Sequence, residues 1–193
     1  MEIEAALPEE GEDEDKDRTL NRLVAITVVT LSVFMAVANI KDDNLVQAMQ
    51  LSKSDAIDTW SEYQATKTKA HIVDTARTEM ALIAGDSPSA AARTAFATMD
   101  AEAKKYAAEV PVLKAKAQAD DAQYDALNVH DDQFDMSDAL ISIAVSLAAV
   151  AALAETRWLL FVAWGFGAFG LLMGIAGFAG WAIHPNALAS FLS

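Results

Sequence analysis

The chain has 193 residues, and its 28 acidic and 14 basic side chains give a formal net charge of -14, yet its mean hydropathy is positive. A high net charge and a positive mean hydropathy can coexist when charged and apolar residues lie in separate segments of the chain. This pattern is typical of polar segments that alternate with membrane-spanning ones. The negative charge argues against a nucleic-acid partner, and the lack of cysteine excludes disulfides, thiolate metal sites and cysteine nucleophiles.

The first two segments are predicted to be an acidic tail and a membrane span. Residues 1–18 are dominated by Asp and Glu and have little to bury, so we expect a disordered, solvated tail rather than an acidic docking motif. Residues 23–38 carry no charge, and their flanks extend them to a span over residues 19–40. An Ala-x-Ala pattern at 36–38 resembles a signal cleavage site, but the acidic front end favours an uncleaved anchor.

Residues 41–135 are polar and rich in Ala, and they predict two long helices joined by a turn at 85–89. Gly85 is placed to end the first helix, and Ser87 with Pro88 is placed to start the second. The segment is therefore expected to form an antiparallel helical hairpin outside the membrane, resembling a coiled coil.

The second arm of this hairpin carries an apolar repeat of 3.5 residues from Ala92 to Phe134. Such a repeat predicts a coiled-coil seam, with a kink or a local break near Pro111. The first arm is less regular, with one stripe from Val46 to Tyr63 and a second from Val73 to Ile83. The large seam residues expected at an interface are Phe96, Met99, Tyr106, Val110, Leu113, Tyr124 and Leu127.

Two further spans are predicted at 136–154 and 158–183, and a short tail at 184–193 follows. The break at residues 155–157 is so short that the two spans should form a tight hairpin. Small residues on one face let helices approach closely in lipid. The predicted contact face comprises Gly167, Gly170, Gly174 and Gly177, and the span before it offers Ala144, Ala148 and Ala151.

Basic residues flank the first span at Arg18 and Arg22, and Arg157 lies between the last two spans. The positive-inside rule then predicts a cytoplasmic N-terminus, with the hairpin and the C-terminus expected on the outer side of the membrane.

Two stretches of the chain have a distinctive composition. The first contains Trp60, Tyr63, Gln64, Ala65 and Lys67, and the second contains Phe134, Asp135, Ala139, Leu140, Ile143, Ala144, Arg157 and Trp158. With these residues the chain resembles the bacterial domain-of-unknown-function 4337 family of small membrane proteins. The resemblance implies one N-terminal span, an Ala-rich helical middle and a C-terminal pair of spans. The acidic tail and the single Arg between the last two spans depart from the family pattern.

Two groups of side chains are candidates for a site. Trp60, Gln64, Lys67 and His71, with Tyr63 beside them, form a polar and aromatic stripe, which indicates a helix-packing face or, less readily, a partner-recognition patch. Asp131, Asp135 and Asp138 share a helix face and could attract cations, with Asp42 and Asp43 at the same depth. A hydrated charge collar is the favoured interpretation of these acids.

No catalytic motif is present in the sequence, and no charge lies at the centre of a span. We therefore expect neither an enzyme nor a cofactor. The predicted protein is an all-helical protein of a bacterial inner membrane with a periplasmic hairpin, and it self-associates as a scaffold through that hairpin and its glycine-rich span. A homo-oligomeric cation channel and an accessory subunit of a larger membrane complex remain as alternatives.

Overall fold

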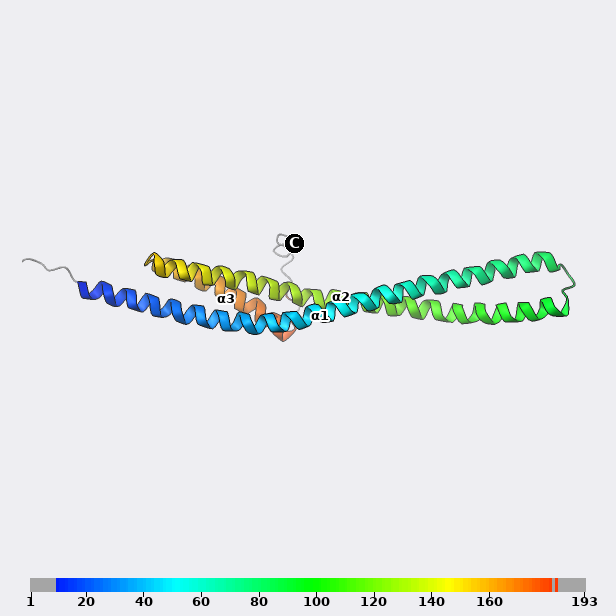
Figure 1. Ribbon diagram of the computed structural model, residues 1–193, viewed down its shortest axis with the longest axis horizontal. Helices are drawn as coiled ribbons and strands as arrows, with labels where there is room; N and C mark the ends of the chain where they lie inside the picture. Colours follow the sequence, from blue (N-terminus) through cyan, green and yellow to red (C-terminus); the bar gives the residue numbers. More distant parts are fainter. Residues whose placement is uncertain (1–9, 182, 184–193) are drawn as a thin grey trace, which may run out of the picture. The chain divides into compact units, whose positions relative to one another are not determined.

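The computed structural model describes the backbone of residues 10–181 and 183, and the side chains from Asp17 onward. In this part of the chain the secondary structure is entirely helical, which confirms the predicted fold class. The three helices are α1 (Glu10–Ala84), α2 (Ala90–Leu153) and α3 (Arg157–Ala179) (Figure 1). Each is long and apolar enough to cross a membrane.

Helix α1 begins earlier than the sequence predicts. It starts at Glu10 instead of residue 19, so residues 10–18 are helical rather than disordered. Acidic side chains in a first turn favour helix formation because they complement the positive end of the helix dipole. The rest of the predicted tail, residues 1–9, and the predicted C-terminal tail lie outside the described residues.

The turn between α1 and α2 occupies residues 85–89. Gly85 has a φ of 57° and ends α1, as its backbone N–H bonds the Ala81 carbonyl oxygen at 3.3 Å. Helix α2 is capped by Ser89 and not by the predicted Ser87, because the Ser89 Oγ accepts the Ala92 N–H at 3.2 Å. Pro111 lies inside α2 without ending it, so the local break expected there is absent.

The chain divides into two compact units. Of the described residues, those within Met1–Val46 and Asn128–Ser193 form a three-helix unit, and Gln47–Leu127 forms a hairpin unit. The boundaries lie outside the predicted ends of the spans at residues 40 and 136. The three-helix packing extends past the apolar stretches because Leu45, Gln133 and Phe134 are also buried.

The core of the three-helix unit forms where small residues allow the helices to approach closely. Ala144, Ala148, Ala151, Ala163 and Ala176 are all fully buried. Larger apolar side chains pack against this small-residue surface, among them Leu20, Val24, Leu31, Ile141 and Leu160. Close backbone approach of this kind joins helices in lipid, where the hydrophobic effect does not.

The connection from α2 to α3 is a tight turn at residues 154–156. Glu155 adopts a left-handed conformation with a φ of 52°. The Thr156 N–H bonds the Ala151 carbonyl oxygen at 3.0 Å, and the Glu155 N–H bonds the Ala152 carbonyl oxygen at 3.4 Å. These two bonds form a Schellman motif in which Glu takes the place usually held by glycine.

Candidate functional site

The predicted glycine face lies inside the three-helix unit. A Cβ added to Gly170 would come 2.8 Å from Ile141 Cγ1, and one added to Gly177 would come 2.9 Å from Phe134 Cζ. A Cβ on Gly174 would come 2.6 Å from Phe34 Cε1. Since α1 and α2 of the same chain already occupy this face, the prediction that it joins separate copies is corrected: it holds α3 against its own neighbours.

A polar contact holds the end of α3. Gln133 is fully buried, and its Nε2 donates to the carbonyl oxygens of Trp181 at 2.7 Å and of Ile183 at 2.6 Å. Because both amide hydrogens are used, the Oε1 is an acceptor, and His130 Nδ1 at 3.1 Å carries the proton. Gln133 therefore ties the chain beyond α3 to α2.

An acid cluster, Asp42 with Asp131 and Asp135, lies beyond the apolar part of the three-helix unit. Burial, followed by repulsion from Asp131 and Asp135, raises the pKa of Asp42 to about 6. Burial also raises the pKa values of Asp131 and Asp135, with neighbouring carboxylates adding to the effect. One carboxyl oxygen of Asp42, Oδ1, is buried and has no hydrogen-bond partner among the described residues. At mildly acidic pH the acid cluster therefore carries less negative charge than a collar of fully ionised carboxylates would.

This acid cluster predicts a pH-dependent stability. The folded-state pKa of Asp42 lies above its ordinary value of 3.8, so the folded chain binds more protons between about pH 4 and 6. Linkage then requires the free energy of unfolding to fall as pH rises through that window. For this partly exposed group the loss is about 1 kcal/mol after solvent screening.

Asp42→Asn should weaken that pH dependence and raise the melting temperature at pH 7. The check is thermal unfolding between pH 4 and 7.5, with Asp58→Asn at an exposed position of α1 as the control. An unchanged slope in Asp42→Asn would contradict the assignment.

In the hairpin unit, α1 packs through a regular line of hydroxyl residues. Ser52, Thr59 and Thr66 are spaced seven residues apart and are buried; we call them the hydroxyl seam. Ser52 Oγ donates to the Asp120 carbonyl oxygen, and Thr59 Oγ1 donates to Asp120 Oδ2, each at 3.0 Å. Both hydroxyls are satisfied by the facing helix, which fixes the register of α1 against α2.

Charged groups complete this contact. Lys116 Nζ lies 3.1 Å from Asp120 Oδ2 and 2.8 Å from Thr59 Oγ1, and its hydrogen bond lowers the pKa of the Asp120 carboxyl. Trp60 Nε1 donates to Asp121 Oδ2 at 2.8 Å. The Trp60 indole is therefore held within the hairpin.

The other members of the predicted polar stripe lie on the surface. Gln64, Lys67 and His71 are exposed, and Lys67 Nζ lies 6.0 Å from the centre of the Tyr63 ring. His71 lines a shallow groove of about 420 Å³ on α1 with Ile72, which is 62% exposed. The stripe is thus divided between a packing contact at Trp60 and an open surface at His71.

The predicted α2 seam faces α1, but burial is uneven along the length of the hairpin unit. Phe96, Met99, Tyr106, Val110, Leu113, Tyr124 and Leu127 are all half-buried. The buried residues of the hairpin unit lie between 49 and 66 on α1 and at Ala117 on α2. None of residues 67–116 is fully buried. The part of the hairpin nearest its turn, which we call the distal hairpin, is therefore incompletely covered.

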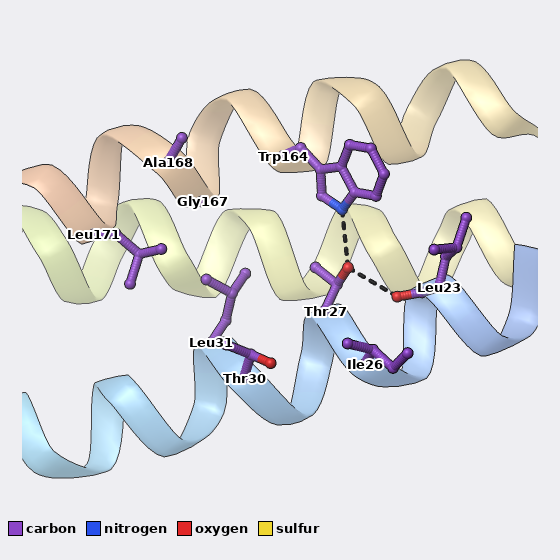
Figure 2. A pocket seen from close by; sticks show the side chains of 9 residues that line it. All are labelled: Leu23, Ile26, Thr27, Thr30, Leu31, Trp164, Gly167, Ala168 and Leu171. Atoms are coloured by element: carbon purple, nitrogen blue, oxygen red, sulfur yellow. Dashed lines mark hydrogen bonds between the residues drawn. The ribbon is translucent and has the colours of Figure 1, made fainter.

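An apolar groove of about 310 Å³ runs between α1 and α3 in the three-helix unit, and we call it the α1–α3 groove. Figure 2 shows Trp164 reaching across it from α3 toward Thr27 on α1. Its Nε1 donates to Thr27 Oγ1 at 2.9 Å, and that hydroxyl donates to the Leu23 carbonyl oxygen at 2.9 Å. The lining residues are Leu23, Ile26, Thr27, Thr30, Leu31, Trp164, Gly167, Ala168 and Leu171.

A family model described as "Domain of unknown function (DUF4337)" matches residues 20–180. The chain belongs to this family. The match covers all three apolar segments and the whole hairpin unit of this DUF4337 chain. No curated protein and no solved structure matches it.

No metal site is evident in the part of this DUF4337 chain that the structure describes, since no three His or acidic side chains there are grouped to hold an ion. Of the acids of the predicted cation collar, burial and neighbouring carboxylates raise the pKa values of Asp131 and Asp135. Sequence reasoning missed Gln133, the hydroxyl seam and the Trp164–Thr27 bond, because each depends on a partner far away in the chain.

Proposed function

We propose that the chain is a non-enzymatic scaffold of a bacterial inner membrane, and that further copies of it assemble through the distal hairpin. The observation that carries this proposal is the uneven burial of the hairpin unit. Its seam includes Phe96, Tyr106 and Leu113, yet none of residues 67–116 is fully buried. In a hairpin of two helices, each helix covers only one side of the apolar seam of the other. In a bundle of four helices both sides of each seam are covered.

A second copy of the chain is the simplest source of the missing cover. It supplies a surface of the same length and pattern, as a symmetric dimer interface requires. Ile72 in the shallow groove offers it an apolar contact. The glycine face takes no part in this assembly, because it is filled within the chain.

The orientation keeps the N-terminus in the cytoplasm and the hairpin in the periplasm. In support, Thr19 and Arg157 line one cavity, so the two basic flanks of the spans lie at the same membrane surface. The positive-inside rule places such flanks on the cytoplasmic side.

Ile72→Asp tests the assembly. The side chain is 62% exposed, so the substitution removes little contact within the chain, but it would place a charge inside an interface between copies. We expect the dissociation constant to rise at least about tenfold, measured as native mass in mild detergent across protein concentrations. The matched control is Ala107→Asp, an exposed position on α2 of the distal hairpin, which should leave the mass unchanged.

A monomeric wild-type chain would overturn the proposal. A fixed ratio with a different protein would favour the accessory subunit. Cation flux in liposomes that disappears when Asp131, Asp135 and Asp138 are changed to Asn would favour the channel.

A further inference from the structure

The α1–α3 groove continues toward one surface of the membrane. A second cavity, of about 130 Å³, shares Leu23 and Trp164 with it and is also lined by Thr19, Leu160 and Arg157. The two cavities adjoin at Leu23 and Trp164, whose indole lies across the groove between them. We call the two together the path; it is polar at Thr19 and Arg157 and apolar beyond Leu160.

The length of the apolar part corresponds to one leaflet of a bilayer. From Leu160 to Leu171 helix α3 rises roughly 17 Å at 1.5 Å per residue. The hydrocarbon core of a bilayer is about 30 Å thick, so one leaflet is about 15 Å. A single acyl chain that enters from the polar end would end near Leu171.

The lining of the groove suits a hydrocarbon chain. The Thr27 hydroxyl and the Trp164 indole N–H are bonded to each other, and that hydroxyl also donates to the Leu23 carbonyl oxygen. These groups therefore need no partner from a ligand. Ile26 is 55% exposed and Trp164 is 39% exposed, so the groove is open along its side.

The charge at the mouth indicates the headgroup. Arg157 lines the polar end of the path. Arg22 is exposed and lies three residues after Thr19 and four before Ile26, which places it on the same face of α1. Two guanidinium groups beside an apolar groove complement a phosphate attached to an acyl chain.

We propose that the α1–α3 groove binds one acyl chain of an anionic membrane phospholipid, whose headgroup phosphate lies at Arg157 and Arg22. The lipid would fill the groove that the side chains of α1 and α3 leave open. The site is independent of the distal hairpin and of the assembly proposed for it.

The test is native mass spectrometry of the full chain released from nanodiscs that contain phosphatidylglycerol and phosphatidylcholine in equal amounts. We expect one phosphatidylglycerol to stay bound to the wild type. Ala168→Trp should lose this lipid, because Ala168 lines the groove and an indole there would fill it. The matched control, Ala149→Trp at an exposed position of α2, should retain it.

The headgroup contact is tested separately. Arg157→Gln and Arg22→Gln should each weaken the preference for phosphatidylglycerol about fivefold, because one basic residue near anionic lipid contributes about 1 kcal/mol. Arg157→Lys should restore most of the preference. Circular dichroism of each variant checks that the helices remain folded.

Two results would overturn the proposal: retention of the lipid by Ala168→Trp, or equal retention of both lipids by the wild type. A photoreactive group on the acyl chain that labels neither α1 nor α3 would contradict it as well. Disulfide cross-linking of an Ala168→Cys variant to a second copy of itself would show that the groove binds protein instead.

Discussion

Gly174→Leu is expected to destabilise the three-helix unit by roughly 3 kcal/mol. Any Cβ at this position would come 2.6 Å from Phe34 Cε1 and 2.8 Å from Ser137 Oγ. Phe34 has little room to move, because its ring already packs edge-on against Phe178 with 6.3 Å between ring centres. Helix α3 must therefore move away from both α1 and α2.

Gly165→Leu is the matched control, since a Cβ there would meet no described atom within 4 Å. It should change the free energy of unfolding by less than about 0.5 kcal/mol. The measurement is loss of helicity during titration from mild detergent into dodecyl sulfate. Equal midpoints for the two variants would show that the glycine face does not pack within the chain.

The absence of cysteine from the chain allows a second readout. Ala144 Cβ lies 3.5 Å from the position of a Cβ on Gly167, which is within the range of a disulfide. The pair Ala144→Cys and Gly167→Cys should therefore cross-link α2 to α3 on oxidation. The added Gly174→Leu substitution should reduce the yield of that cross-link.

Gln133→Leu is expected to cost about 2 to 4 kcal/mol of stability. The side chain is fully buried and donates to the carbonyl oxygens of Trp181 and Ile183. Leucine fills a similar volume but removes three hydrogen bonds, the two to these carbonyl oxygens and the one from His130 Nδ1. Each such bond contributes about 0.5 to 1.5 kcal/mol.

Exposed Gln123 on the same helix provides the control, because Gln123→Leu makes the same chemical change without loss of a buried contact. Thermal unfolding in detergent should separate the two variants by several degrees. Hydrogen exchange at Trp181 should accelerate only in Gln133→Leu. If the two variants melt alike, Gln133 does not hold the end of α3.

The features that could be predicted from the sequence are those that depend on runs of apolar residues or on residues that end helices, such as glycine. Uncharged runs mark the three spans, and Gly85 marks the turn of the hairpin. The repeat from Ala92 to Phe134 identifies the face of α2 that lies against α1, because a period of 3.5 residues keeps one face toward a neighbour.

The hydroxyl seam could not be identified in the same way. Ser52, Thr59 and Thr66 are polar, so the face that they form reads as solvent-exposed in a single helix. Their burial depends on acceptors such as the Asp120 carbonyl oxygen, 68 positions from Ser52 along the chain. The apolar stripe predicted from Val46 to Tyr63 therefore misses half of the packed face, and Ile83 in the second stripe is 86% exposed.

The contacts of the glycine face could not be predicted for a related reason. Spacing shows that Gly167 to Gly177 share one side of a helix, and any close neighbour would satisfy that pattern. The sequence offers Ala144 on the preceding span as one such neighbour, and it lies against Gly167. The contacts with Phe34, Ser137 and Phe134 depend on positions that the spacing does not give.

The tight turn at residues 154–156 also sets an order of assembly. Helices α2 and α3 meet across a connection of a few residues, so closing that loop costs little entropy. Contacts between α1 and α3, such as Thr27 with Trp164, span 137 positions and are favoured later on a folding pathway. We therefore expect α2 and α3 to insert as a preformed pair whose groove stays open until α1 docks, and lipid can occupy it during that interval.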